Sequence, residues 1–254
     1  MTISIPLVAA IFLISLILTM VGLGGGLVFS PLFVLLGFAK VDAASASLFL
    51  NLIAAASAAY AYSRKKMVDF TLAVPLIVSS SLAAPIGSYI NARIELKYFL
   101  IVMAVALAFA SLRMLMGPGN KDEAVPTIPP LRKIVGGGAI GACIGFLGGF
   151  LGIGGGVFVV PLLIYVLKTP TKIAAASSTF IVCFSSLTGF LGYASMGQVD
   201  WRFILPAAVA SFAGGQIGAR IMSSRLKGKT IRTIFGVVLL VLCLKLLHRA
   251  LFGS

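Results

Sequence analysis

The sequence predicts an all-α integral membrane protein with two inverted repeats, on three observations. The chain has 254 residues, of which 60% are hydrophobic and only 10% are charged, whereas an ordinary soluble domain is nearer 45–50% apolar and about 25% charged. Its apolar residues recur in runs of about 20, the length that a helix needs to cross about 30 Å of hydrocarbon. In addition, both halves of the chain carry the same glycine-rich motif.

Ten apolar segments, separated by short connections, account for nearly the whole chain. The longest connection, 117–131, is rich in proline, glycine and charged residues and divides the chain nearly in half. We therefore expect one transmembrane domain over residues 1–254, with a first repeat of about five segments at 1–116 and a second at 132–254. The expected segments are 4–22, 25–39, 43–62, 70–92, 97–116, 133–151, 155–167, 173–194, 202–222 and 231–247.

The second half of the chain repeats the first. GLGGGLVFSP at Gly22–Pro31 matches GIGGGVFVVP at Gly152–Pro161 at an offset of 130 residues. After one inserted residue the offset becomes 131, and matched pairs continue in the same order. They are Ser47 with Ser178, Phe49 with Phe180, Tyr62 with Tyr193, Val68 and Asp69 with Val199 and Asp200, Pro75 with Pro206, and Ile86 and Gly87 with Ile217 and Gly218. Ordered matches indicate an internal duplication, which is typical of transporters.

The distribution of basic residues predicts how the repeats are oriented. As one helix, residues 4–39 would be about 54 Å long, which exceeds the bilayer. If a glycine-broken helical hairpin opens each repeat instead, the repeats are inverted and 14 of the 20 Lys and Arg residues fall on one side. A single crossing would split them 10 to 10. The positive-inside rule favours the hairpin, in a multi-pass protein of the cell (inner) membrane with both termini on the non-cytoplasmic side.

The two glycine clusters are the first candidate for a binding site, because each precedes a new helix start. A helix N-terminus carries unpaired N–H groups and a partial positive charge, and glycine lets an oxyanion approach the backbone closely. Close helix packing through small residues is the alternative, and it is the only role we expect for Gly148, Gly149, Gly214, Gly215 and Gly218. The candidate substrate-binding glycines are Gly24, Gly25, Gly26, Gly154, Gly155 and Gly156.

Small polar side chains on the segment after each hairpin are the second candidate. Their hydroxyl and amide donors suit a sulfur or phosphorus oxyanion, although ordinary hydrogen bonding between helices would also explain them. The candidate substrate-binding residues of this kind are Ser47, Asn51, Ser178 and Thr179.

The charged and reactive residues exclude several classes of function. All six acidic residues lie at segment ends or in loops, whereas proton and cation carriers often keep a carboxylate inside the membrane, so an anionic substrate is favoured. One histidine near the C-terminus and three separated cysteines leave little from which to build an active site or a metal centre. We therefore expect no enzyme activity, no metal and no cofactor. The basic residues lie between apolar runs, so nucleic-acid binding is not expected.

Three aromatic residues lie near segment ends, where tyrosine and tryptophan commonly anchor a protein at the membrane interface. We expect that role for Tyr62, Tyr193 and Trp201.

In their order, duplication and spacing, these motifs resemble the sulfite exporter TauE/SafE family. The resemblance is carried by the G-x-G-G-G-x-x-x-x-P turn in each half, by the helices at Ala43–Ser47 and Ala174–Thr179, and by the Val-Asp pair before the next helix. It implies transport of sulfite, thiosulfate, sulfonates or related small sulfur-containing anions, and it assigns no catalytic residue. We expect export by an alternating-access carrier; an anion channel and a non-transporting scaffold or receptor remain alternatives. The expected partners are the anionic substrate, the lipid bilayer and, as an open alternative, a second copy in a homodimer.

Overall fold

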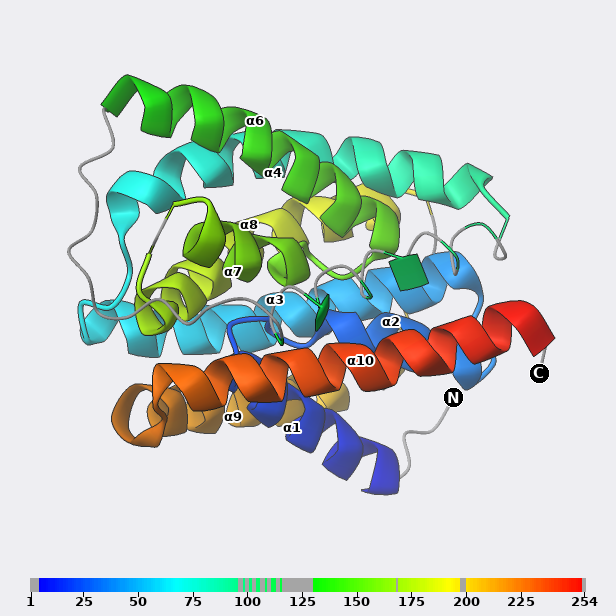
Figure 1. Cartoon of the computed structure of the whole chain (residues 1–254). Coiled ribbons are helices and arrows are strands. Elements are labelled where there is room, and N and C mark those ends of the chain that lie inside the picture. The colour runs from blue at the N-terminus through cyan, green and yellow to red at the C-terminus, as the bar shows by residue number, and fades with distance from the viewer. Residues whose placement is uncertain are drawn as a thin grey trace.

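The computed structural model describes residues 5–95, scattered positions between 98 and 115, and residues 130–167, 169–196 and 200–252. Most of the fifth expected segment and residues 117–129 of the expected loop lie outside the described residues. All regular secondary structure in the described part is helical (Figure 1). The helices are α1 (Ile5–Met20), α2 (Gly26–Leu35), α3 (Lys40–Arg64), α4 (Phe70–Arg93), α6 (Pro130–Leu151), α7 (Gly156–Tyr165), α8 (Thr171–Ala194), α9 (Trp201–Arg225) and α10 (Gly228–Phe252).

Helix length separates two kinds of element. α3, α4, α8 and α9 have 24 or 25 residues each and are long and apolar enough to cross a membrane; at 1.5 Å per residue they are about 36 Å long. By contrast, α2 and α7 have only 10 residues each, or about 15 Å, which is half of a hydrocarbon core. The expected all-helical, membrane-embedded protein is confirmed, and the second limb of each hairpin is shorter than expected.

The predicted helix breaks at the two glycine clusters are confirmed, between α1 and α2 and between α6 and α7. At each break the chain reverses, so that the short helix runs back towards the start of the preceding one (Figure 1). The reversal uses a left-handed backbone conformation that glycine adopts without steric cost. Positive φ angles occur at Gly22 (85°), Gly24 (79°), Gly152 (66°), Gly154 (72°) and Gly155 (83°).

The two halves of the chain are interlocked. α1 packs against α9, and α6 packs against α4, so the first limb of each hairpin is held by the other half. Between them α3 and α8 are neighbours that run antiparallel (Figure 1): Asn51 is bonded to Ser186, while the earlier Leu48 lies against the later Gly189.

Glycine allows the close approach of these helices. A Cβ atom at Gly214 would collide with the carbonyl oxygen of Phe12, and one at Gly218 with that of Leu16. The packing role expected for these glycines of α9 is therefore confirmed. Gly148 packs against the second glycine break itself, since a Cβ atom there would lie 2.5 Å from the backbone nitrogen of Gly155.

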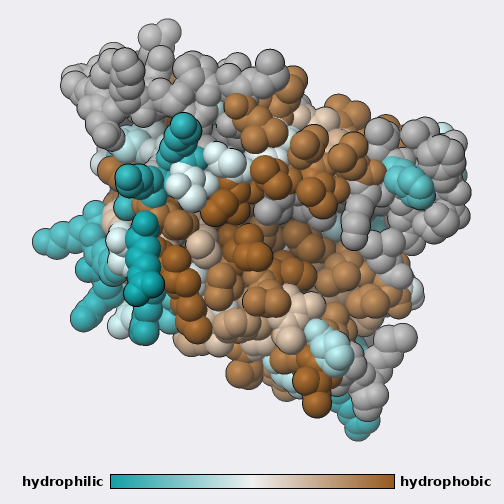
Figure 2. Space-filling view, turned by 60° about the horizontal axis from the view of Figure 1, so that its bottom comes forward, coloured by the Kyte–Doolittle hydropathy of each residue, from teal (hydrophilic) through white to brown (hydrophobic). Residues whose placement is uncertain are grey.

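The surface has the polarity of a membrane protein. Figure 2 shows an apolar band across one face and hydrophilic residues gathered at one end. Large apolar side chains such as Leu82 and Val209 are each 72% exposed, which suits contact with lipid rather than water. The basic C-terminal ends of α3 and α9 lie together, because Lys65 Nζ donates to Ser223 Oγ at 2.7 Å.

Candidate functional site

The two glycine turns meet at the centre of the molecule. A Cβ atom at Gly26 would lie 2.9 Å from the carbonyl oxygen of Ile153, and one at Gly156 would lie 3.2 Å from Leu23. All the candidate glycines are buried. The long helices α3 and α8 contact the turns through Asn51 and residues near Val182, close to their own midpoints. Since those helices are long enough to cross a membrane, the turns lie near the middle of that length.

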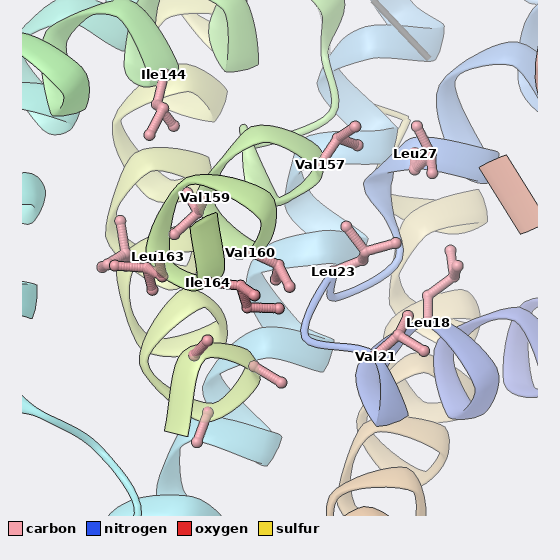
Figure 3. Packing of buried hydrophobic residues seen from close by; sticks show 14 of the residues in the cluster. Leu18, Val21, Leu23, Leu27, Ile144, Val157, Val159, Val160, Leu163 and Ile164 are labelled. Atoms are coloured by element: carbon pink, nitrogen blue, oxygen red, sulfur yellow. The ribbon is translucent and has the colours of Figure 1, made fainter. Parts of the chain in front are cut away.

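Buried apolar side chains surround the two turns. Figure 3 shows Leu23 of the first turn directed towards Val157 and Val160 of α7, in one buried hydrophobic cluster. Each of these three side chains is at most 1% exposed. A polar group in this region must therefore find its hydrogen-bond partner within the protein.

Asn51 of α3 bridges the two turns and is fully buried. Its Oδ1 accepts hydrogen bonds from the backbone N–H groups of Gly25 and Gly26, at 2.5 and 2.9 Å. Its Nδ2 donates to Ser186 Oγ at 2.7 Å and to the Ile153 carbonyl oxygen at 3.3 Å. The amide thus caps the N-terminus of α2, as an N-cap asparagine does, but from a different helix. Two of the N–H groups that we expected to face an anion, those of Gly25 and Gly26, are bonded here to an amide oxygen.

The second turn has different surroundings. The residue that matches Asn51 at the offset of 131 is Val182, whose methyl groups lie 3.3 and 3.1 Å from the Cβ positions of Gly154 and Gly156. Among the described residues, no side chain accepts a hydrogen bond from the N–H group of Gly155 or Gly156. An isopropyl group therefore occupies the position where the first turn has a hydrogen-bond acceptor.

Ser47 and Ser178 make matching contacts to the turns of the opposite halves. Ser178 Oγ donates to the Gly22 carbonyl oxygen at 2.9 Å. Ser47 Oγ lies 2.9 Å from the carbonyl oxygens of both Gly152 and Gly26, and it can donate to one of them at a time. The structure therefore brings both predicted serines to the glycine turns, where their hydroxyl groups are engaged with backbone carbonyls.

The remaining predicted hydroxyl and two unpredicted ones lie on α8. Thr179 Oγ1 donates to the carbonyl oxygen of Ala175 in its own helix, at 2.8 Å. Sequence reasoning missed Ser185, which donates to the Gly154 carbonyl oxygen at 2.7 Å, and Ser186, the partner of the Asn51 amide. Their matched positions in the first half are alanines, and that difference between the halves is the signal that could have found them.

The interfacial role expected for two tyrosines is wrong. Tyr62 and Tyr193 are completely buried and donate hydrogen bonds at 3.1 Å to the carbonyl oxygens of Thr19 and Gly149, just before the glycine turns. Each tyrosine hydroxyl needs such a partner once the ring is buried. Trp201, at the start of α9, is 49% exposed.

The carboxylates of the described residues lie at the ends of the long helices, away from the turns. Asp69 caps α4 by accepting from the N–H groups of Thr71 and Leu72, at 3.0 and 3.3 Å. Asp200 caps α9 in the same way. Asp42 lies in the first turn of α3. Within the described part of the chain, no group of three or more His, Cys, Asp or Glu residues could hold a metal ion.

Long apolar helices around a pair of broken helices that meet near the middle of their length are typical of a membrane transporter. The chain belongs to the sulfite exporter TauE/SafE family, whose profile matches residues 7–246. It is similar to the probable membrane transporter protein YunE of Bacillus subtilis (strain 168), with 29% identity over 258 residues that cover 92% of this chain and 94% of the relative. A probable membrane transporter protein of Xylella fastidiosa (strain 9a5c) is 28% identical to this chain, in an alignment that covers 94% of this chain and 92% of the relative. No solved structure matches the chain significantly.

Proposed function

We propose that the protein exports a small anion, a sulfur oxyanion or organosulfonate such as sulfite, thiosulfate or a sulfonate, across the cell membrane by alternating access. The observation that carries the proposal is the meeting of two broken helices at the centre of the molecule, where two short helices begin. Once the turns separate, these helix N-termini would present N–H groups to an anion. The sulfite exporter family, to which the chain belongs, supports the sulfur-containing substrate class.

The chemistry of the centre suits an anion that must be released again. A charge buried in low dielectric must regain the interactions that water gave it. No Lys, Arg, Asp or Glu whose side chain the structure describes is buried, so these residues place neither a strong counter-charge nor a repelling carboxylate there. Helix N-termini contribute roughly 0.3–2 kcal/mol each, which is enough to orient an anion without trapping it.

We propose that the substrate binds between the two turns when they separate. In that open conformation the N–H groups of Gly24–Gly26 and Gly154–Gly156 face the anion, with the side chains of Ser47, Asn51 and Ser178 beside them. The buried arrangement described above is then the closed state, in which the same groups bond to each other.

The experiment that tests transport is counterflow in liposomes reconstituted with the purified protein. A carrier gives saturable, transient accumulation of radiolabelled sulfite or thiosulfate against an excess of internal unlabelled anion. A channel gives flux without counterflow, and a scaffold or receptor gives no flux of any anion tested. Absence of counterflow for sulfite, thiosulfate and methanesulfonate overturns the proposal.

We further propose that the protein spans the membrane as two inverted repeats of five segments, with both termini outside. The antiparallel arrangement of α3 and α8, which occupy matching places in the two halves, supports the inverted relation of the repeats. α1 begins and α10 ends at the end of the molecule opposite the α3–α4 connection (Figure 1). That connection carries Arg64, Lys65 and Lys66, which the positive-inside rule assigns to the cytoplasm.

The topology is tested with single cysteines in a background without Cys143, Cys183 and Cys243. A cysteine at Lys65 should resist a membrane-impermeant thiol reagent applied to intact cells. A cysteine at Glu95, which is exposed at the opposite end of α4, should react and serves as the matched control. Ready labelling at Lys65 with protection at Glu95 would reverse the orientation.

A further inference from the structure

The amide of Asn51 occupies a position that an oxyanion would also fit. Its Oδ1 atom carries partial negative charge and receives two converging N–H groups, from Gly25 and Gly26, at the first turn of α2. Converging N–H groups at a helix N-terminus are the arrangement that binds sulfate, phosphate and carboxylate oxygens. The protein therefore supplies its own acceptor at this end of α2.

We propose that Asn51 is an internal ligand, which competes with the transported anion for the N–H groups of Gly25 and Gly26 and leaves them when the anion binds. The position of Oδ1 then marks where one oxygen atom of the anion sits. This inference rests on the proposed function, and it assigns Asn51 a role as a competitor of the substrate rather than as one of its donors.

The other end of the same amide links this exchange to the second hairpin. Nδ2 donates to Ser186 Oγ and to the carbonyl oxygen of Ile153, both in the second half of the chain. The carboxamide is planar and rigid, so Oδ1 cannot leave the N–H groups of the first turn while both Nδ2 bonds keep their geometry. Displacement of Asn51 by an anion thus breaks contacts between the hairpins, and the anion shifts the protein towards the conformation in which they separate.

Among the side chains that the structure describes, such an internal acceptor is found only at the first turn. Val182 occupies the matching place at the second turn and has no hydrogen-bond acceptor. An anion that binds to the second turn displaces no internal acceptor there. The competition is therefore specific to the first turn, and Val182 provides a matched control.

The experiment measures the affinity of sulfite and of thiosulfate for the purified protein, by calorimetry and by ligand-dependent thermal stability. Asn51→Asp keeps the size of the side chain and holds both N–H groups with a charged oxygen, so the anion affinity should fall by at least about tenfold, since hydrogen bonds to charged groups are the stronger ones. Asn51→Ala removes the competitor, so the affinity should rise by roughly three- to tenfold. Val182→Ala should leave the affinity within about twofold of the wild type, because it removes no hydrogen bond.

The opposite signs of the two Asn51 variants decide the inference. If both variants bind the anion more weakly, Asn51 is a substrate donor or a purely structural residue, and the competition is wrong. If Asn51→Ala does not fold, Asn51→Leu takes its place, because leucine has a similar size and also lacks a hydrogen-bond acceptor. An affinity equal to or weaker than that of the wild type in Asn51→Leu then overturns the competition. A wild type that responds to neither anion, nor to methanesulfonate, overturns the proposed function and this inference with it. A wild-type response together with unchanged variants overturns only the inference.

Discussion

The two glycine turns share a motif, yet they differ in what surrounds them. In the first turn Gly25 has a φ of −169°, outside the left-handed region, and its N–H group is bonded to Asn51. The second has Gly155 in the left-handed region, with a φ of 83°, and Val182 beside the turn. The motif therefore determines that the helix breaks, while the long helix packed against each turn determines its chemistry.

Around the turns, the contacts of the two halves correspond closely. Tyr62 and Tyr193 bond to carbonyl groups that precede the two turns, and Ser47 and Ser178 each reach the turn of the other half. Because this framework is matched, the difference at the centre is confined to a few side chains of α3 and α8. Substitutions there test the comparison with little disturbance elsewhere.

The largest expected effect comes from the different backbone conformations of Gly25 and Gly155. Gly155→Ala should lower the melting temperature, and shortening a neighbouring side chain should not restore it, unlike for Gly25→Ala. The reason is that a left-handed alanine costs about 1–2 kcal/mol and that its Cβ atom would lie 2.9 Å from the backbone carbonyl oxygen of Ile144. At Gly25 the three nearest atoms all belong to the ring of Phe29. Phe29→Leu should therefore rescue the melting temperature of Gly25→Ala, whereas Ile144→Ala should not rescue Gly155→Ala.

The melting temperatures of the single and double variants in detergent provide the measurement. Phe29→Leu and Ile144→Ala alone are the controls for lost packing. Full rescue of Gly155→Ala by Ile144→Ala would mean that side-chain crowding, not backbone conformation, distinguishes the two turns.

The second prediction makes the two turns alike. Val182→Asn places an amide at the second turn, near the carbonyl oxygen of Leu23. The residue that matches Ser186, the hydroxyl partner of the Asn51 amide, is Ala55 and offers no hydroxyl group. Adding Ala55→Ser supplies that hydroxyl group, so the double variant should be more stable than the sum of the single changes by about 0.5–1.5 kcal/mol. It should also bind the anion more weakly than the wild type. Thermal unfolding of the wild type, the two single variants and the double variant measures the coupling free energy between residues 55 and 182. Strictly additive changes in stability would contradict the prediction.

These comparisons show how far the sequence could predict the molecule. Hydropathy and the duplicated motif were sufficient for the helices and for both breaks, because a glycine cluster interrupts a helix locally. The hydrogen bonds of the centre were not predictable in the same way. That Asn51 would cap the helix of the first turn depends on how α3 packs against it, which no local pattern encodes. The burial of Tyr62 and Tyr193 was missed for the same reason: position near a segment end does not reveal which face of the helix a residue occupies.

The third prediction concerns the two buried tyrosines. Tyr62→Phe removes one donor to the carbonyl oxygen of Thr19, which keeps its hydrogen bond from the N–H group of Gly22. Tyr193→Phe removes the acceptor of Asn91 Nδ2 as well as the donor to Gly149. We expect a cost of about 1 kcal/mol for Tyr62→Phe and one larger by about 1–2 kcal/mol for Tyr193→Phe. Chemical or thermal unfolding measures both, and equal costs would indicate that Asn91 finds another acceptor.

The smallest expected effect concerns Asp69 and Asp200, the helix caps at the starts of α4 and α9. Their carboxylates accept hydrogen bonds from the first turns of α4 and α9, whereas the glycine turns bond to Asn51, Ser47 and Ser178. The two carboxylates are therefore not among the groups of the proposed anion site. Asparagine also accepts hydrogen bonds at an N-cap, so Asp69→Asn and Asp200→Asn remove the charge and keep the cap. Counterflow of sulfite should therefore persist at nearly the wild-type rate in both variants, with Asp69→Ala and Asp200→Ala as controls for the loss of the cap. If either asparagine variant is folded and inserted but transports nothing, the carboxylate itself takes part in coupling, and a site at the glycine turns alone is insufficient for transport.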